Sequence, residues 1–483
     1  MNRNAKIVAT IGPASQDEEV IEKLIQVGMD VARMNFSHGT HEEHAQRIAT
    51  IRKVSEKMGV GVGILQDLQG PKIRVGSLPV PLQLSEGEIV TLYATNTFPS
   101  AGNEQQIPVD FRQLFDSVRT SDKLLLDDGR LALEVVSVKE NALMARVVVG
   151  GLLTAHKGIN LPGVRLRIAC FTDKDEDDLA FGISQNVDAV AISFVRSAED
   201  VKRVRSALER LSKGKRTPFL IAKLEKPEAL DDLDTILDVV DGVMVARGDL
   251  GVELPPERVP ALQKYIIQAA NRRAKLVITA TQMLESMITN LLPTRAEASD
   301  VANAIFDGTD AVMLSAETAS GKYPIQAVQM MDRIVCEAES HFLEWGKELD
   351  TIQGFDASDA ASMARAAQVL ANDKNVTAVA CFTTRGRTAW LMSKIRPRAP
   401  ILAFTPDHDT YRQLAFLWGV KPQLVPYVSS LEEMLHLVDD ALMKTFHPGD
   451  QVVLVCGYPV GAMVAPNMAL LHTVGEKEKS ATH

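Results

Sequence analysis

Short apolar runs that stop abruptly at charged residues recur along this chain. The segment FLIAKLEKPEAL ends its apolar run at Lys223 and Glu225, and VDGVMVARGDLGVELP ends its run at Arg247 and Asp249. A continuous run of Val, Ile, Leu and Ala is typical of a strand buried on both faces. Such a strand cannot carry an unpaired charge along its length, because an isolated buried ion is too costly. The charges at the two strand ends therefore predict a functional site.

Eight runs of this kind alternate with amphipathic helical patterns such as DEEVIEKLIQVG and AEDVKRVRSALERL. The alternation is typical of βα units. Eight strands close a (β/α)8 barrel, or TIM barrel, whose active site lies at the carboxyl ends of the strands. The predicted strands begin at Lys6, Asp30, Gly63, Asp188, Phe219, Gly242, Lys275 and Ala311. Polar residues at the ends of nearly all of them form a predicted rim: Asn35, Ser37, Asp67, Ser193, Lys223, Glu225, Asp249, Thr281, Ser315 and Glu317.

The alternation of strands and helices is interrupted between the third and fourth predicted strands. From about Gly70 to Gly163 the chain shows short alternating strands and turn signals, as in LQLSEGEIVTLYA and NALMARVVVGG. In LLLDDGRLAL, an Asp-Gly pair between apolar runs indicates a hairpin. We expect a small inserted β-barrel in a barrel loop, where a mobile lid can close over the site.

A third unit follows the linker-like stretch LDTIQGFDASD. The predicted strands VTAVACF, PILAFT, PQLVPYV and DQVVLVCGYP alternate with helical segments such as SLEEMLHLVDDALMKTF, which is typical of an open, doubly wound α/β sheet. About three domains also fit a chain of 483 residues. We expect a catalytic barrel of residues 1–69 and 167–345, a lid of residues 70–166 and a C-terminal regulatory domain of residues 346–483.

Composition narrows the class of protein. Hydrophobic residues at 46% and charged residues at 24% are typical of a globular chain, and a net charge of −10 without a basic stripe argues against nucleic-acid binding. The four cysteines are far apart in apolar contexts, which favours buried free thiols in a reducing compartment. No segment resembles a signal peptide, and none reaches the roughly 18 apolar residues of a membrane span. We expect a soluble cytoplasmic protein.

Two clusters of polar residues have spacings similar to those of metal ligands, but we favour a structural explanation for both. The acidic run from Asp173 to Asp178 lacks the Gly and the closing Glu of a calcium loop. Thr172 and Asp175 have capping-box spacing, so the run indicates a solvated helix start. His38, His41 and His44 recur at helical spacing, which suits metal ligands. Glu42 and Glu43 lie between them near a helix start, so an exposed first helical turn is favoured instead.

The motifs at the strand ends converge on one rim. Lys223 and Glu225 are two residues apart, so they share a face of their strand and can approach an anionic substrate held through a metal ion. Each motif alone has a structural alternative, since Glu225 can pair with Lys223, and Arg247 with Asp249. Their placement around one barrel favours a functional rim. The other motifs are RMNFSHG, QDLQGPKIR and TATQMLESM.

Together these residues resemble the pyruvate kinase family over essentially the whole chain. The most specific segments are MNFSHG, GPKIR, HKGINLPG, KLEKPEAL, MVARGDLGVE, ATQMLESM and PTRAEASDVANAIFDGTDAVMLSAETASGKYP. The resemblance implies a glycolytic phosphotransferase that converts phosphoenolpyruvate and ADP to pyruvate and ATP with Mg²⁺ or Mn²⁺. It also implies a homotetramer with an allosteric, phosphorylated effector.

The resemblance assigns roles that suit phosphoryl transfer, which needs positioning and charge neutralisation. Glu225 and Asp249 would hold Mg²⁺ through hard oxygens. Lys223 would stabilise the phosphoryl group and the developing enolate as a fixed cation, and Arg33 would bind the phosphoryl group. Thr281 is implicated in protonating the enolate; because its hydroxyl is a weak acid, we expect a water relay with Ser315 and Glu317. Substrate-binding candidates are Arg33, Lys223, Gly248, Asp249 and Thr281, and nucleotide-binding candidates are Asn35, His38, Arg74 and Lys157, with Asp128 as a second lid candidate.

One departure from the family pattern concerns K⁺. Many members bind a monovalent cation where this chain has Asn35, Ser37, Asp67 and Leu68, with Thr common at the last position. Potassium-requiring members commonly have Glu where this chain has Lys72. The Lys72 ammonium can supply the missing positive charge, so we expect that K⁺ is not required.

The predicted effector loop lies in the C-terminal unit. Backbone N–H groups at a helix start, with Arg385 and Arg387 nearby, suit a phosphate. The family's phosphate loop matches Thr383, Thr384, Arg385, Gly386, Arg387 and Thr388. The later segment CGYPVGAMVAPN departs from the common glycine-rich pattern, which favours a monophosphate, such as a sugar phosphate or AMP, over a bisphosphate.

Two other functions fit parts of this pattern. A barrel lyase or aldolase acting on phosphoenolpyruvate or pyruvate would also use Mg²⁺ and Arg, but it needs no lid lysine for a nucleotide. The lack of a Walker A motif does not argue against a kinase, because the lid can hold the phosphates. A non-enzymatic metabolite sensor would be expected to lack Lys223, Glu225 or Asp249, and all three are present.

Overall fold

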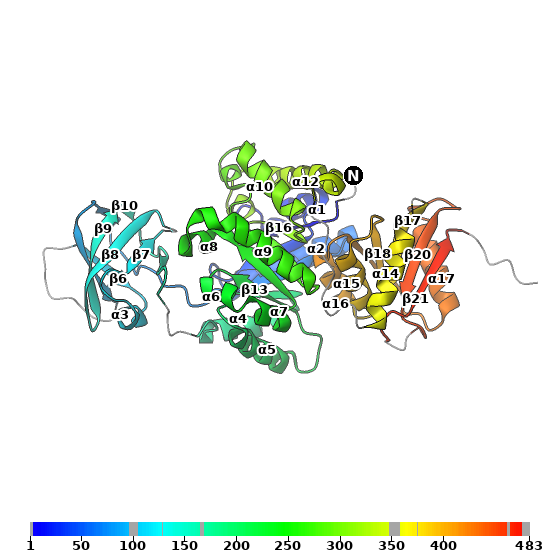
Figure 1. The fold of residues 1–483 in the computed structure, drawn as a ribbon, viewed down its shortest axis with the longest axis horizontal. Coiled ribbons are helices and arrows are strands. Elements are labelled where there is room, and N and C mark those ends of the chain that lie inside the picture. Colours follow the sequence, from blue (N-terminus) through cyan, green and yellow to red (C-terminus); the bar gives the residue numbers. More distant parts are fainter. Residues whose placement is uncertain are drawn as a thin grey trace, which may run out of the picture.

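The computed structural model describes residues 3–95, 105–127, 129–164, 169–346, 358–373, 375–460 and 464–475. Three bodies lie in a row (Figure 1). An all-β module lies at one end, a barrel with its helices in the middle and a C-terminal α/β domain at the other end. The predicted order of three units is confirmed.

The central body is a closed barrel of eight parallel strands, in the order β1-β16-β15-β14-β13-β12-β3-β2. All eight predicted runs form its strands, and they are buried because helices cover the outside while side chains fill the interior. The strands are β1 (Lys6–Thr10), β2 (Val31–Asn35), β3 (Gly63–Asp67), β12 (Ala189–Ile192), β13 (Phe219–Leu224), β14 (Gly242–Ala246), β15 (Leu276–Ala280) and β16 (Ala311–Leu314).

Helices connect these strands, and several begin at the predicted caps. In α4, Thr172 and Asp175 form the expected capping box, which satisfies otherwise unpaired N–H groups. Thr40 and Glu43 form another at the start of α2. The helices of this body are α1 (Glu18–Gln26), α2 (His41–Met58), α4 (Asp173–Ser184), α5 (Ala198–Ser212), α6 (Pro227–Asp231), α7 (Leu233–Val239), α8 (Arg247–Glu253), α9 (Val259–Arg272), α10 (Arg295–Phe306), α11 (Ala316–Ala319), α12 (Pro324–Ser340) and α13 (Phe342–Trp345).

The insertion after β3 is the predicted small β module, with one short helix, α3, that was not predicted. It has a six-stranded sheet in the order β11-β7-β8-β9-β5-β6 and a two-stranded sheet of β10 and β4. Arg74 pairs with Gly158 beside β11, and Val75 pairs with Val109 of β6, so the entering segment bridges the two edge strands and closes the module. The predicted hairpin joins β7 to β8. The elements are β4 (Leu82–Leu84), β5 (Ile89–Ala94), β6 (Gln105–Val109), α3 (Gln113–Ser117), β7 (Lys123–Leu126), β8 (Leu131–Lys139), β9 (Ala142–Val149), β10 (Gly151–Leu153) and β11 (Ile159–Asn160).

The C-terminal domain is an open sheet in the order β19-β18-β17-β20-β21. Two predictions here need correction. The third strand begins at Val420 rather than Pro422, and Pro422 is tolerated because β19 lies at the sheet edge. An antiparallel edge strand, β21, was not predicted; its residues are half-buried or exposed and lack the apolar run of a central strand. The elements are α14 (Asp359–Ala371), β17 (Val376–Phe382), α15 (Arg387–Ile395), β18 (Ile401–Thr405), α16 (His408–Gln413), η3 (Leu414–Phe416), β19 (Val420–Leu424), α17 (Leu431–Leu442), β20 (Gln451–Cys456) and β21 (Met468–Thr473).

The C-terminal domain covers the amino-terminal face of the barrel. One apolar core contains inward-facing barrel residues such as Val8 and Leu65 together with Phe416 and Leu417 of the C-terminal domain. A Cβ atom on Gly63, the first residue of β3, would lie 2.4 Å from the Phe416 ring. The carboxyl-terminal face is therefore left for the active site.

The domain boundaries given above remain a prediction. The boundary between residues 166 and 167 and most of the linker after residue 346 lie outside the described residues. All four cysteines are free thiols; three are buried as expected, and Cys336 is partly exposed. Among the helices of the described ranges, none combines the length and apolarity needed to cross a membrane.

Candidate active site

Lys223 is the centre of a buried polar network at the end of β13. Its ammonium lies 2.8 Å from Glu225 Oε1 and 3.3 Å from Asp67 Oδ1, and it donates to Ser193 Oγ at 2.8 Å. These acceptors come from the ends of β13, β3 and β12, so three neighbouring strands orient the lysine. Burial alone would lower the pKa of Lys223, but the carboxylates of Asp67 and Glu225 outweigh it and raise that pKa. Lys223 is therefore a permanent cation.

Asp67 joins this lysine to Arg33. Arg33 Nε donates to Asp67 Oδ2 at 2.7 Å, and its NH1 donates to Thr10 Oγ1 at 2.9 Å. Burial by itself would raise the pKa of Asp67, yet Lys223 and Arg33 hold it below the ordinary value. Asp67 thus stays ionised and fixes two cations side by side.

Glu225 and Asp249 supply the negative charge expected of a metal site. Burial, and then the like charge of Asp249, raise the pKa of Glu225, although Lys223 opposes them. Glu225 Oε2 also accepts the backbone N–H of Phe194 at 2.9 Å. Asp249 lies in the first turn of α8, on the wall of a cleft. In the described parts of the chain no group of three His, Cys, Asp or Glu residues could hold a metal, so a cation here needs substrate oxygens or water as further ligands.

A cleft of about 830 Å³ opens beside this network at the carboxyl ends of the strands. It brings together predicted residues from β2, α8, the end of β15 and the start of α11. A space of this size suits small-molecule substrates. The predicted residues in its lining are Arg33, Asn35, His38, Lys72, Gly248, Asp249, Thr281, Ser315 and Glu317.

Thr281 faces this cleft from a strained turn. Its φ is 66°, which a β-branched residue rarely adopts. The turn is stabilised because Gly248 N donates to Thr281 Oγ1 at 2.7 Å and Arg247 NH2 donates to the Thr281 carbonyl at 2.8 Å. Arg247 pairs with Asp300 at 2.6 Å, so the alternative pair with Asp249 is not formed. The Lys223–Glu225 pair, by contrast, is formed.

Ser315 and Glu317 approach the same cleft from the end of β16. Glu317 is buried, and its carboxylate accepts the N–H of Ser315 at 2.7 Å and of Leu284 at 3.2 Å. Burial raises the pKa of Glu317. A carboxyl group with a raised pKa can hold and exchange a proton closer to neutral pH than an ordinary one.

The nucleotide candidates divide into two groups. Asn35 and His38 line the cleft, and burial together with Arg74, Lys72 and Arg33 lowers the pKa of His38. Arg74 donates to the His156 carbonyl at 3.0 Å, and Lys157 pairs with Asp127 at 2.7 Å within the lid. Neither Arg74 nor Lys157 is part of the cleft lining. Asp128 lies outside the described residues.

The prediction of an exposed turn at the histidines was wrong for His44. Glu42 and Glu43 are exposed, but His44 is buried, stacks on Phe36 with centroids 4.1 Å apart and lies 2.9 Å from the His38 carbonyl through Nε2. His44 follows the first turn by one residue, and this places it on the face of α2 that packs on the barrel.

Of the predicted monovalent-cation residues, Asp67 is already paired with two side-chain cations. Both Asp67 oxygens are paired with Arg33 and Lys223, as above. Leu68 is buried in the apolar core. Lys72 lines the cleft, and Ser37 lies in the turn after β2, where its N–H donates to Asn35 Oδ1 at 3.2 Å.

The predicted effector loop lies far along the chain, at the start of α15. Its residues line a cavity of about 170 Å³ together with Gly457, Val464 and Pro466 of the second segment singled out above. Gly386 has a φ of 80° and is the N-cap of α15. The two segments thus meet at one small cavity.

Three residues that contact the predicted site residues were not given a role in the sequence analysis. Ser193 and Thr10 both follow the strand-end rule that identified the rim, so that signal was available. Asp300 lies within α10 and reaches Arg247 only in the folded structure. No local pattern marks it.

Comparison with known proteins agrees with this architecture. Residues 2–328 match the family model "Pyruvate kinase, barrel domain", and residues 361–472 match "Pyruvate kinase, alpha/beta domain". The pyruvate kinase of Mycobacterium tuberculosis is 42% identical over 481 residues, covering 99% of this chain and all of that protein. That of Geobacillus stearothermophilus is 42% identical over 99% of this chain and 81% of its own length. Pyruvate kinase 2 of Synechocystis is 46% identical over 94% of this chain and 76% of its own. The chain therefore belongs to the pyruvate kinase family, whose members are phosphotransferases.

Proposed function

We propose that this chain transfers the phosphoryl group of phosphoenolpyruvate to ADP through a metal-assisted enolate at the cleft described above. The observation that carries the proposal is the Lys223 network, in which a largely buried, permanent cation is held between Asp67, Ser193 and Glu225 beside a second carboxylate, Asp249. Positive charge and carboxylate oxygens, which suit a divalent cation, support this proposal because they lie together on the rim.

The side chains divide the work of phosphoryl transfer. Arg33 and Lys223 bind and orient the phosphoryl group, and Asp67 keeps both cations in place. Glu225 and Asp249 would hold Mg²⁺ or Mn²⁺, which would neutralise charge on the phosphoryl and enolate oxygens. A terminal oxygen of ADP bonds to phosphorus as the bond from phosphorus to the enol oxygen breaks. Lys223 then stabilises the enolate oxygen that is left.

The enolate carbon must next take up a proton. Thr281, Ser315 and Glu317 all face the cleft from neighbouring strand ends. We propose a relay in which Glu317 supplies the proton through Ser315 and water to the region of Thr281, because the raised pKa of Glu317 suits exchange. If the relay runs through the hydroxyl of Thr281, then Thr281→Ser keeps enolate protonation and Thr281→Val loses it, measured as exchange of pyruvate methyl protons with deuterated water. Full exchange in both variants would contradict it.

Nucleotide binding is assigned to Asn35, His38, Arg74 and Lys157. Arg74 lies where the chain enters the inserted module and Lys157 lies within it, so both approach the cleft if the module rotates towards the barrel. We propose that ADP binding closes the lid in this way.

One coupled assay tests the reaction. ADP-dependent formation of pyruvate, followed with and without Mg²⁺, is expected to require both. A lyase would consume phosphoenolpyruvate without ADP, and a metabolite sensor would form no pyruvate. Either result would refute the proposed function.

We further propose that the reaction needs no K⁺. Lys72 lines the cleft and the Asp67 carboxylate is already shared by two cations. Replacing K⁺ by tetramethylammonium at constant ionic strength is expected to leave the rate unchanged, since the added cation would be redundant. Lys72→Glu is expected to create a K⁺ requirement. A many-fold loss of the parent rate without K⁺ would refute this.

We propose that residues 383–388 bind a phosphorylated effector at the cavity that they share with Gly457, Val460, Val464, Ala465 and Pro466.

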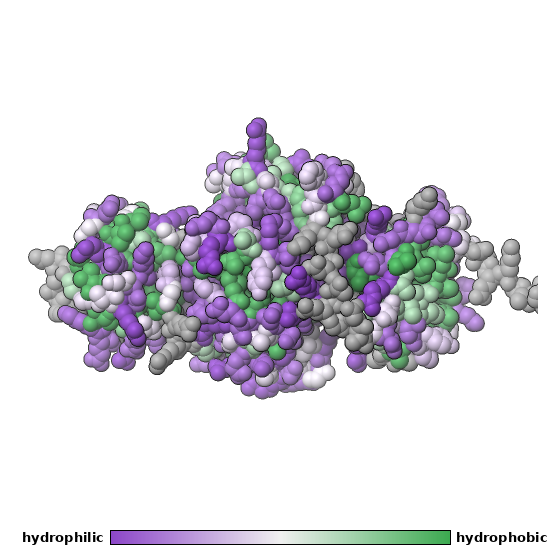
Figure 2. Space-filling view, in the orientation of Figure 1, coloured by the Kyte–Doolittle hydropathy of each residue, from purple (hydrophilic) through white to green (hydrophobic). Residues whose placement is uncertain are grey.

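A cytoplasmic homotetramer is also proposed. Leu343 and Trp345 of α13 are 75% and 71% exposed beside an apolar groove between α10 and α12. Figure 2 shows apolar residues gathered on the C-terminal domain, where Figure 1 draws β20 and β21, and Leu471 of β21 is exposed. Such surfaces favour association, and light scattering on the purified chain measures the oligomeric state.

A further inference from the structure

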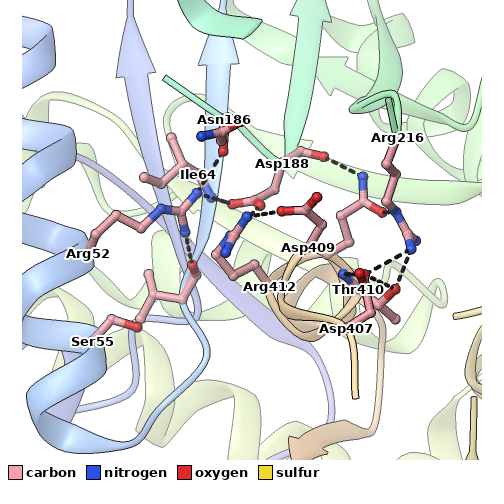
Figure 3. Close-up of polar contacts among 12 residues, drawn as sticks. Arg52, Ser55, Ile64, Asn186, Asp188, Arg216, Asp407, Asp409, Thr410 and Arg412 are labelled. Carbon is pink, nitrogen blue, oxygen red and sulfur yellow. Dashed lines mark hydrogen bonds and ion pairs between the residues drawn. The ribbon is translucent and has the colours of Figure 1, made fainter. Parts of the chain in front are cut away.

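Arg216 connects the barrel to the proposed effector loop. It lies in the loop between α5 and β13, and its guanidinium donates to the side chains of Gln413 and Thr410 on α16 (Figure 3). Its NH2 also donates to the Arg385 carbonyl at 3.1 Å. One side chain of the barrel therefore contacts both α16 of the C-terminal domain and the loop of residues 383–388.

Thr410 completes this contact. Its hydroxyl, which accepts from Arg216, lies 2.8 Å from the Thr384 carbonyl and 2.7 Å from Asp407 Oδ1. Thr410 is fully buried. The carbonyls of Thr384 and Arg385 are thus held by one connected group of side chains, so a shift in the loop backbone must displace Arg216 or break its contacts.

The same helix, α16, is also anchored to the barrel through Asp188. This buried carboxylate takes donors from three elements: Ile64 N at 2.8 Å, Arg52 NH2 at 2.7 Å and Arg412 Nε at 3.0 Å (Figure 3). Gln413 Nε2 also donates to the Asp188 carbonyl at 3.2 Å. Because every charge at this anchor is paired, we treat it as the rigid reference against which the contacts of Arg216 can move.

Three strands lead from this interface to the catalytic lysine. Asp188 directly precedes β12, which ends beside Ser193, and Arg216 comes three residues before β13, which carries Lys223. The third strand, β3, begins at Gly63 against Phe416 and ends at Asp67. The strands are four to six residues long; β3 and β12 are fully buried, and four of the six residues of β13 are buried. Close-packed interiors transmit displacement instead of absorbing it.

We propose that Arg216 is a positioning residue that couples occupancy of the 383–388 loop to Lys223 through the start of β13. The inference rests on the effector role proposed for that loop. Binding of a phosphate at the loop changes the positions of the Thr384 and Arg385 carbonyls, and Arg216 moves with them. The start of β13 then shifts slightly relative to β12, and this shift changes the positions of the three acceptors around Lys223. Arg216 touches neither substrate nor reacting atoms.

The test compares Arg216→Ala and Arg216→Lys with Arg210→Ala, a matched control. Arg210 is also a barrel arginine close by, but it is exposed and pairs with Glu176, away from α16. AMP and ribose 5-phosphate serve as probes. For each protein, calorimetry gives the Kd of the probe, and steady-state rates give the half-saturating phosphoenolpyruvate concentration with and without saturating probe.

In the parent and in Arg210→Ala, the probe is expected to shift half-saturation about fivefold or more, the lower range of allosteric coupling. In Arg216→Ala the shift is expected to vanish while the Kd of the probe stays within about threefold, since the loop keeps its own phosphate contacts. Arg216→Lys is expected to lose the shift too, because one ammonium cannot span the three contacts. A retained shift in Arg216→Ala, or loss of probe binding, would overturn the inference.

A second measurement separates this inference from the effector proposal. If neither probe binds the parent protein, the effector proposal fails, and the coupling is tested without ligand. Gly386→Ala strains the loop, because its φ of 80° disfavours a side chain whose Cβ would lie 3.6 Å from Arg216 NH2. We expect Gly386→Ala to change the KM for phosphoenolpyruvate when Arg216 is present and not in the Arg216→Ala background. An equal change in both backgrounds, or no change in either, would overturn the coupling.

Discussion

Buried carboxylates flanked by two cations occur at both ends of the barrel, and their neighbours differ. At the amino-terminal face, Asp188 and Asp310 each also accept a backbone N–H, and the C-terminal domain covers both. At the carboxyl-terminal face, Asp67 has its two cations, but Glu225 and Asp249 add negative charge beside an open cleft. The partners are Arg52 and Arg412 for Asp188, Lys394 and Arg396 for Asp310, and Arg33 and Lys223 for Asp67.

A structural cluster and a reactive one can be distinguished by whether their charges are fully paired. A paired, covered cluster has no capacity left for a ligand, so its loss is felt as lost stability. A cluster with excess carboxylate charge at a cleft has room for a cation, and its loss is felt as lost chemistry. Two paired lysines, the largely buried Lys223 at one face and the fully buried Lys394 at the other, allow a direct test.

The largest effect is expected for Lys223→Met. Removing a preorganised charge at the reacting oxygens costs about a thousandfold in kcat. The coupled pyruvate assay measures it, and thermal unfolding shows whether the variant is folded. If folded Lys223→Met had a kcat near that of the parent, the charge cluster at the carboxyl-terminal face would be structural, like the clusters at the amino-terminal face.

Lys394→Met is the matched change at the other face. Lys394 is buried and bonds to Asp310 and to the Lys275 carbonyl at 2.6 Å. Its removal leaves the buried carboxylate with one cation and is expected to cost about 3 kcal/mol in the free energy of unfolding. The kcat of the folded fraction is expected to stay within about twofold, because the site is distant. Urea titration and active-site assays measure the two; a large fall in kcat without lost stability would contradict the comparison.

Glu225→Gln sharpens the comparison without an activity readout. We expect Mn²⁺ binding, followed by electron paramagnetic resonance without substrate, to weaken at least about tenfold, since even outer-shell partners of metal ligands are worth that much. Glu228→Gln, nearby on α6, is the control. Unchanged Mn²⁺ affinity in Glu225→Gln would remove this residue from the metal site.

The smallest effect concerns pH. The pKa of Glu225 is raised in the folded state by burial and by Asp249, so its contribution to stability is fully present below the unfolded value near 4.5 and is lost as pH rises through the folded value. Glu225→Gln is thus expected to raise the thermal midpoint of the metal-free protein at neutral pH, with the gain fading as pH falls towards 4.5. In the parent, the affinity for Mn²⁺ is expected to decrease as the pH is lowered, because protons compete with the metal ion for the Glu225 carboxylate. A destabilised Glu225→Gln at neutral pH would contradict the first expectation, and an Mn²⁺ affinity that does not change with pH would contradict the second.

Several features could be predicted from sequence because burial leaves a local trace. The eight barrel strands are buried on both faces, so each is a continuous apolar run, and residues such as Lys223, Glu225 and Thr281 follow directly from where those runs end. Edge strands leave a weaker trace. β19 begins two residues earlier than predicted and β21 was missed, since neither has an uninterrupted apolar run.

Local patterns were enough to predict the eight barrel strands, the order of the three units and the polar residues at the strand ends, because periodicity and charge placement are local properties. Tertiary structure alone decided which charges meet. It paired Arg247 with Asp300 instead of Asp249, buried His44 and joined Arg216 to the loop of residues 383–388. These contacts join positions far apart in the chain, and their energies depend on burial and geometry that exist once the barrel has closed and the C-terminal domain has covered its amino-terminal face.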